Sequence, residues 1–212
     1  MAAEETPDGV GYASVVPAED ERWRDLVENG LGLRFHRVGW RDLSRGPVTL
    51  DYPDPDTIGA DRLCDAAAAV SRHGAPVLVM DFGTCLTAAF IGPDRVWRGG
   101  VIAPGYPALR DYLPGRAAKL PRMEEPASGV ALPRYGRSTM EAMQLGVRLG
   151  CRGMVREIAA SLLEGFDGEC ARVATGGYAR TALEGSGLGF TIDPDLTLAG
   201  IGLLFPKDEE KE

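Results

Sequence analysis

The spacing of apolar residues alternates along the chain between the two-residue period of strands and the three-to-four-residue period of helices. Because the two kinds of element alternate, the pattern predicts an α/β fold. The segment PVLVMD at 76–81 is apolar up to its last residue, which is typical of a strand covered on both faces. Strands are predicted at 11–16, 33–38, 48–52, 76–84, 86–91 and 171–177, and VWRGG (96–100) is predicted to form a hairpin with 86–91. Helices are predicted at 18–29, 58–73, 138–164 and 195–204, with helical pieces near 106–119, a loop at roughly 121–136 and a helix from Tyr178.

The longest predicted helix, 138–164, carries a stripe of glycines beside its apolar face. The stripe consists of Gly146, Gly150 and Gly153. A glycine inside a helix costs about 1 kcal/mol relative to alanine. We therefore expect another helix to approach closely there, with a subunit interface as one place where this would happen.

Composition and charge exclude several classes of protein. Hydrophobic residues make up 44% and charged residues 25% of the 212 residues, which is ordinary for a globular protein. The net charge of −8 argues against a basic nucleic-acid-binding surface. No apolar run approaches the roughly 18–20 residues of a membrane span, and the acidic N-terminus lacks the signal-peptide pattern. We expect a cytoplasmic protein with neither a nucleic-acid nor a membrane partner.

Cysteine and histidine usage argues against zinc and hydrolase chemistry. The four cysteines, at 64, 85, 151 and 170, form no CxxC pair, and the two histidines are His36 and His73. A structural zinc site needs clustered Cys and His ligands. We expect reduced cysteines, and histidines with structural or surface roles.

Two glycine-bearing strand ends are candidates for phosphate and nucleotide binding. Asp81 ends a buried strand and is followed by Gly83 and Thr84, so a carboxylate lies beside backbone amides and a hydroxyl. This combination suits a cation together with phosphate oxygens, although a capped turn is the plainer alternative. Gly176 and Gly177 end the strand 171–177 and would let the backbone approach a base or ribose. By itself, the second motif is better explained as an ordinary strand-to-helix turn.

A third candidate is the helix start Gly59-Ala60-Asp61-Arg62. Asp61 is suited to accept a proton from a substrate hydroxyl. Arg62 is suited to hold a substrate carboxylate by a forked pair of hydrogen bonds. The alternative is an aspartate that balances the helix dipole, followed by a surface arginine.

Taken together, an ordered set of segments from Ser14 to Leu204 resembles type III pantothenate kinase, a family of the acetate-kinase/sugar-kinase/Hsp70/actin superfamily. The resemblance implies an α/β fold with two ribonuclease-H-like lobes, for which we place the boundary near residue 75, giving 1–75 and 76–212. The segments are SVVP (14–17), YPDPDTIGADR (52–62), DFGTCLT (81–87), GGVIAPG (99–105), AAKLP (117–121), GRSTMEAMQLG (136–146), TGG (175–177) and DPDLTLAGI (193–201).

The resemblance implies ATP-dependent phosphorylation of pantothenate, the first committed step of coenzyme A synthesis, by a homodimer that uses Mg²⁺ with ATP and a monovalent cation, K⁺ or NH₄⁺. Leu86 departs from the family, which usually has threonine there, so the resemblance does not extend to one polar contact on the phosphate side. The implied roles are a catalytic base for Asp61, pantothenate binding for Tyr52, Gly59, Arg62 and Thr139 (the last at the dimer interface), cation binding for Asp81, and nucleotide binding for Gly83, Thr84, Gly176 and Gly177.

A second departure lies before Ser14. The family opens with a strand carrying an Asp-x-Gly-Asn-Thr phosphate motif, then a hairpin and a helix, whereas the 13 residues before Ser14 contain no such motif. We therefore expect a truncated first lobe with an exposed apolar strand edge. Phosphoryl transfer depends on gripping the phosphates, so we expect this polypeptide by itself to be inactive.

Four interpretations follow from that expectation. The first is a kinase subunit that needs a partner, in a homodimer or heteromer, to supply the missing motif. The second is a catalytically inactive relative that acts as a binding or regulatory module. The third, a sugar or acetyl-group kinase of the same superfamily, is disfavoured because the GADR and GRST segments match the pantothenate pocket. The fourth is that the true start codon lies upstream of Met1.

Overall fold

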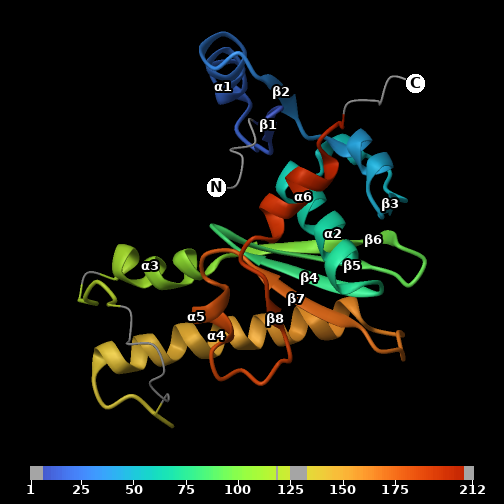
Figure 1. Ribbon diagram of the computed structural model, residues 1–212. Coiled ribbons are helices and arrows are strands. Elements are labelled where there is room, and N and C mark those ends of the chain that lie inside the picture. The colour runs from blue at the N-terminus through green and yellow to red at the C-terminus, as the bar shows by residue number, and fades with distance from the viewer. Residues whose placement is uncertain (1–6, 118, 125–132, 208–212) are drawn as a thin grey trace, which may run out of the picture.

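The computed structural model describes residues 7–117, 119–124 and 133–207, and it confirms the α/β class (Figure 1). Its centre is a six-stranded mixed sheet in the order β3-β6-β5-β4-β7-β8. Strands β4, β5 and β6 pair antiparallel, whereas β3–β6, β4–β7 and β7–β8 pair parallel. The strands are β3 (Thr49–Leu50), β4 (Val77–Phe82), β5 (Cys85–Ile91), β6 (Val96–Pro104), β7 (Ala171–Thr175) and β8 (Thr191–Ile192).

Helices cover both faces of this sheet, as the apolar strand at 76–81 predicts. Along β4, Val77 and Val79 belong to the core under α2 and α6, whereas Leu78, Met80 and Phe82 belong to the core shared with α4. Figure 1 shows α2 and α6 on one side of the sheet and α3, α4 and α5 on the other. The helices are α2 (Ala60–His73), α3 (Tyr106–Arg116), α4 (Thr139–Leu162), α5 (Ala179–Leu183) and α6 (Leu196–Leu204).

A separate N-terminal layer lies beyond α6 (Figure 1). It consists of the parallel pair β1 (Gly9–Tyr12) and β2 (Arg34–Arg37), joined by α1 (Asp20–Asp25), which continues into a wider helical turn, Leu26–Gly30. Gly11 allows β1 to approach α6 closely, because a Cβ there would lie 2.4 Å from a side-chain carbon of Ile201. The layer therefore rests on the last helix of the chain.

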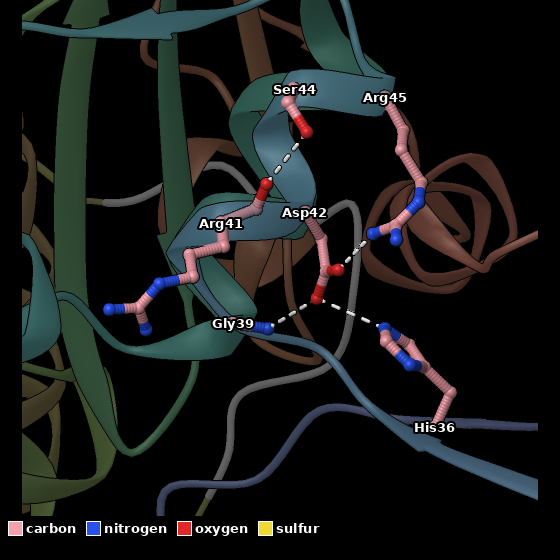
Figure 2. A network of polar contacts seen from close by, with 6 residues as sticks. All are labelled: His36, Gly39, Arg41, Asp42, Ser44 and Arg45. Carbon is pink, nitrogen blue, oxygen red and sulfur yellow. Dashed lines mark hydrogen bonds and ion pairs between the residues drawn. The ribbon is translucent and has the colours of Figure 1, made fainter.

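Asp42 connects this layer to the body of the protein (Figure 2). It lies buried in the 3-10 helix Trp40–Arg45 and accepts hydrogen bonds from the Gly39 amide at 2.8 Å and from His36 Nε2 at 3.0 Å. Arg45 also pairs with it. His36 therefore has the structural role that the sequence predicts, joining β2 to the following helix.

The predicted elements are found, with differences at their ends. The strand predicted at 11–16 lies at 9–12, and the last of the predicted strand residues, Val15 and Val16, are exposed. Strand β6 extends to Pro104, beyond the predicted VWRGG, because its whole length pairs with β5. The two-residue strand β8 is too short to have a period and was not predicted. Part of the loop predicted at 121–136 lies outside the described residues.

No helix packs on the glycine stripe of α4 within the described part of the chain. A Cβ built on Gly146, Gly150 or Gly153 would meet no atom within 4 Å. The close helix contact expected there is therefore not made within one chain, and a contact between subunits stays a prediction. The lobe boundary near residue 75 also stays a prediction. That position lies in the connection between α2 and β4.

Candidate active site

The first turn of α2 presents Asp61. The helix begins after Gly59, and Asp61 Oδ1 accepts a hydrogen bond from the Arg62 amide at 2.8 Å. A Cβ on Gly59 would lie 2.5 Å from the same oxygen, so glycine makes room for the carboxylate. The half-buried Asp61 therefore lies at the N-terminal end of the helix dipole.

Arg62 lies against the strands under α2. Its guanidinium lies over the Trp97 ring, 5.3 Å from the centroid, and Nη2 is 3.4 Å from the Ala88 carbonyl oxygen. Burial lowers the pKa of Arg62, whereas the nearby Tyr52 and Asp61 act in the opposite direction. Tyr52, Asp61 and Arg62, which are predicted site residues, therefore lie close together.

Asp81 lies at the end of β4, where the turns after β4 and β7 meet. Parallel pairing sets Asp81 opposite Thr175 of β7, so the carboxyl ends of both strands share one edge, the usual place for ligands in α/β sheets. A Cβ on Gly83 would be 3.7 Å from Asp81 Oδ1 and one on Gly176 only 2.2 Å from it. Burial first, and then the charge of Asp61, raise the pKa of Asp81 to about 6.

The glycine turn after β7 is held against the turn after β4. Gly176 has φ of +89°, and the Tyr178 amide donates to the Phe82 carbonyl at 3.0 Å. On the other side, a Cβ on Gly105 would come within 2.6 Å of the Gly83 carbonyl oxygen and 2.3 Å of that of Thr84. The predicted nucleotide-binding residues Gly83, Thr84, Gly176 and Gly177 thus lie in two adjacent, tightly packed turns.

Asp65 is a buried acid beside this site that the sequence analysis missed. It is 2% exposed, and its Oδ1 accepts a hydrogen bond from Thr197 Oγ1 at 2.6 Å. Burial raises the pKa of Asp65 to about 7. The Thr197 hydrogen bond acts against this shift, and the charges of Asp81 and Asp61 add to it. Its signal in the sequence is a charged residue four positions after Asp61, on an otherwise alanine-rich helix.

A small cavity joins Asp65 to the site. It has a volume of about 10 Å³, roughly that needed for one water molecule. Its walls come from α2 and from strands β4 and β5, so it lies between the first turn of α2 and the sheet. The lining residues are Arg62, Asp65, Val79, Asp81, Thr87 and Ala89.

Thr139 lies elsewhere, in an apolar groove between α3 and α4. The groove has a volume of about 770 Å³. Among its described lining residues, Thr139 is the one predicted site residue, so the structure does not bring Thr139 together with Asp61 through this groove. The lining is Pro104, Ala108, Leu109, Tyr112, Leu113, Leu120, Thr139, Ala142, Met143, Gly146, Val147 and Gly150.

The donor groups present determine which ions the site suits. The described cysteines are free thiols, as predicted, and in residues 7–117, 119–124 and 133–207 no three His, Cys, Asp or Glu side chains are placed to hold one metal ion. A half-buried carboxylate beside turn carbonyls, as at Asp81, suits a hard cation bound by oxygen.

None of the described helices is long and apolar enough to span a bilayer.

Comparison with known proteins identifies the family. Residues 1–161 match the family model for type III pantothenate kinase. A type III pantothenate kinase of Akkermansia muciniphila is 44% identical over 91% of this chain and 78% of its own length, and one of Bacillus cytotoxicus is 37% identical over 94% and 74%. A solved Baf family structure from Campylobacter jejuni, 18% identical, covers 94% of this chain and 82% of its own with a TM-score of 0.63, so it shares the fold. The chain therefore belongs to the type III pantothenate kinase family.

Proposed function

We propose that this chain phosphorylates the hydroxyl of pantothenate with ATP, using a phosphate-gripping segment supplied from outside its 212 residues. The observation that carries the proposal is the placement of Asp61 and Arg62 in the first turn of α2, beside Asp81 of β4. Arg62 and Asp81 line one small cavity, and burial first, then the charge of Asp61, raises the pKa of Asp81. A proton acceptor and an oxygen-rich turn at the same place are what transfer of a phosphoryl group to an alcohol requires. Family membership supports pantothenate as the alcohol.

In this proposal, Asp61 accepts the proton of the attacking hydroxyl. It lies in the first turn of α2, at the positive end of the helix dipole, and a carboxylate is a group that can act as a general base. Arg62 holds the carboxylate of pantothenate, and Tyr52 and Gly59 complete the pocket wall. The side chains of Asp61 and Arg62 leave adjacent positions of one helical turn, so substrate anchoring and proton removal occur within one short segment.

The two turns at the ends of β4 and β7 bind the nucleotide. Backbone amides around Gly83 and Thr84 face the phosphates, and Gly176 and Gly177 let the backbone approach the adenosine. Asp81 is the ligand for a monovalent cation, K⁺ or NH₄⁺. Bound there, that cation together with Mg²⁺ supplied with ATP would neutralise phosphate charge.

The N-terminal layer is the proposed docking place for the external segment. Among the described residues, β1 and β2 have only each other as strand partners, and a two-stranded sheet is marginally stable alone. Val15 and Val16 are 63% and 53% exposed, and Val15 also borders Gly59. A segment that covers these valines would therefore lie next to Asp61. It would come from a partner chain or from sequence joined upstream.

Self-association through the α3–α4 groove is part of the proposal. The groove is apolar, its rim includes Tyr112, which is 62% exposed, and Gly146 and Gly150 leave open space along it. A second copy seated there would bring its own surface to Thr139. Analytical ultracentrifugation tests this: we expect a dimer for the chain, and a monomer for Gly146→Arg. A chain that is monomeric at tens of micromolar would contradict the homodimer.

The activity is tested with a chimera. The N-terminal segment of the Akkermansia muciniphila relative that precedes its match to Ser14 is fused in front of this chain, and ATP-dependent phosphorylation of radiolabelled pantothenate is measured. We expect turnover by the chimera and none by the 212-residue chain. Asp61→Asn in the chimera should lower kcat by about 10²–10⁴. Ordinary turnover by the chain alone would refute the need for an external segment.

Calorimetry distinguishes an active kinase from the alternative, a catalytically inactive binding module. A folded chimera that binds pantothenate and ATP but never turns over would support the inactive relative instead. A chimera that binds neither ligand would contradict both interpretations.

A further inference from the structure

Trp97 is fully buried in β6, yet its indole donates a hydrogen bond to none of the described residues. Its exposure is 0%, and Nε1 has no hydrogen-bond partner among the described residues. A buried indole N–H usually finds an acceptor, so a tryptophan at this position is not explained by polar contacts. Its distinctive contact is instead with the Arg62 guanidinium, which lies over the ring at 5.3 Å from the centroid.

The sheet encloses Arg62 on two further sides. The Ala88 carbonyl oxygen of β5 lies 3.4 Å from Nη2. On β6, a Cβ at Gly100 would lie 2.8 Å from Nη2 and 1.9 Å from the Ala88 oxygen, so a side chain there would expel the guanidinium. Trp97, Ala88 and Gly100 thus form a slot for Arg62. We use "Arg62 slot" for these three residues.

One donor of the held guanidinium remains unused. Arg62 Nε is buried and has no partner in the described residues. A buried donor without an acceptor is unfavourable by about 1–3 kcal/mol, which an incoming acceptor would remove. The side chain is also partly buried, and this burial lowers the pKa of Arg62 because its charged form loses part of its hydration. An anion arriving there meets an oriented and poorly solvated cation.

We propose that Trp97 is a positioning residue that holds Arg62 ready for the anionic group of the substrate. The identity of the substrate, pantothenate, is taken from the function proposed above. A free arginine side chain carries about 2 kcal/mol of rotamer entropy, which would otherwise be lost on binding. The slot removes part of that freedom before the substrate arrives, so the effect of Trp97 belongs to substrate affinity rather than to the rate of phosphoryl transfer.

A first experiment reads the position of Arg62 without any substrate. In the ¹H–¹⁵N spectrum of the full chain, the Arg62 Nε–Hε signal is assigned by its loss in Arg62→Met. We expect an upfield ring-current displacement in the wild type and in Trp97→Phe, and its disappearance in Trp97→Leu. An unchanged signal in Trp97→Leu would overturn the proposal. Trp97→Met replaces the leucine variant if chemical denaturation shows that the latter is unfolded.

A second experiment uses the active chimera. A cation–π contact of 0.5–2 kcal/mol corresponds to about a two- to thirtyfold change, so Trp97→Leu should raise KM for pantothenate by that factor with kcat within about twofold. Trp97→Phe should recover most of the affinity. In an Arg62→Met background, Trp97→Leu should have no further effect.

The outcomes separate the two proposals. The role of Trp97 would be overturned if Trp97→Phe and Trp97→Leu raised KM for pantothenate equally. It would also be overturned if Trp97→Leu raised KM as much in the Arg62→Met background as in the wild type. Both results would count even if pantothenate is the substrate. A chimera that does not bind pantothenate would overturn the proposed function, and the arginine signal would still decide whether Trp97 holds Arg62.

Discussion

Gly176 and Asp81 lie so close together that position 176 admits no side chain. A Cβ on Gly176 would be 2.2 Å from Asp81 Oδ1 and 2.7 Å from backbone atoms of Phe82, and the φ of +89° already favours glycine. The Asp81 carboxylate and the turn after β7 are therefore packed as one unit.

Gly176→Ala should destabilise the fold and displace Asp81. Left-handed backbone strain and overpacking against main-chain atoms together amount to about 2–4 kcal/mol. Urea denaturation followed by circular dichroism measures the loss. Gly177→Ala is the matched control for stability, because nothing lies within 4 Å of its Cβ position, and it should change the free energy of unfolding by less than about 0.5 kcal/mol. Equal effects of the two variants would refute this packing argument.

Asp65→Asn should remove the fall in stability that Asp65 causes as pH rises. The pKa of Asp65 is raised to about 7 in the folded state, so between its ordinary value and pH 7 the folded chain binds more protons than the unfolded chain. Stability therefore falls as pH rises through this window, by on the order of 2–4 kcal/mol for a shift of this size. Asparagine keeps an acceptor for Thr197 without titrating, so the variant should match the wild type near pH 4 and exceed it at pH 8.

Urea denaturation at pH 4.5, 6 and 8 in potassium-free buffer checks this expectation. Asp167→Asn, at an exposed loop position, serves as the control and should leave the pH profile unchanged. A wild-type stability that does not fall between pH 5 and pH 8 would show that Asp65 is not a proton-binding group of the folded state.

Asp193→Asn should weaken the attachment of α2 to the segment before α6. Arg72 donates to both Asp193 oxygens, at 2.9 and 2.8 Å, and His73 Nε2 lies 3.4 Å away. Burial acts to raise the pKa of Asp193, but these hydrogen bonds outweigh it and lower the pKa. The stabilisation is thus present above the unfolded pKa and is lost as pH falls through the folded one. We expect urea denaturation to show a cost of about 1 kcal/mol at pH 7, because Arg72 is partly screened by solvent, and a smaller difference as the pH falls and Asp193 becomes protonated.

Ser138→Ala should lower stability by about 1 kcal/mol, because it removes the N-cap of α4. Ser138 Oγ accepts from the Glu141 amide at 3.1 Å, and Glu141 Oε2 accepts from the Arg137 amide at 2.7 Å. Ser138→Asp should retain stability, since aspartate caps equally well. Ser161→Ala, inside the same helix, is the control, and thermal unfolding distinguishes the three. A neutral Ser138→Ala would mean that packing alone orders the start of α4, including Thr139.

The sequence by itself was sufficient for what depends on neighbouring residues. The period of apolar positions located nearly all helices and strands, and the order of short motifs identified the family. It was wrong about the extent of β6 and silent on β8, because pairing with β5 and β7, rather than local preference, determines where those strands lie. The sequence also identified Asp61, Arg62, Asp81 and Gly176 as candidates, because each lies at the start of a helix or at the end of a strand.

Only the tertiary structure decided which of these residues meet and what surrounds them. Parallel pairing of β4 with β7 brings Asp81 to Gly176 across almost a hundred residues of sequence, and packing of α2 on the sheet places Arg62 over Trp97. The same packing buries Asp65 against Thr197, whereas Thr139 faces a separate groove. These contacts depend on the register of the strands and on the orientation of the helices. The packing of the whole core determines both, so the spacing of neighbouring residues in the sequence does not predict them.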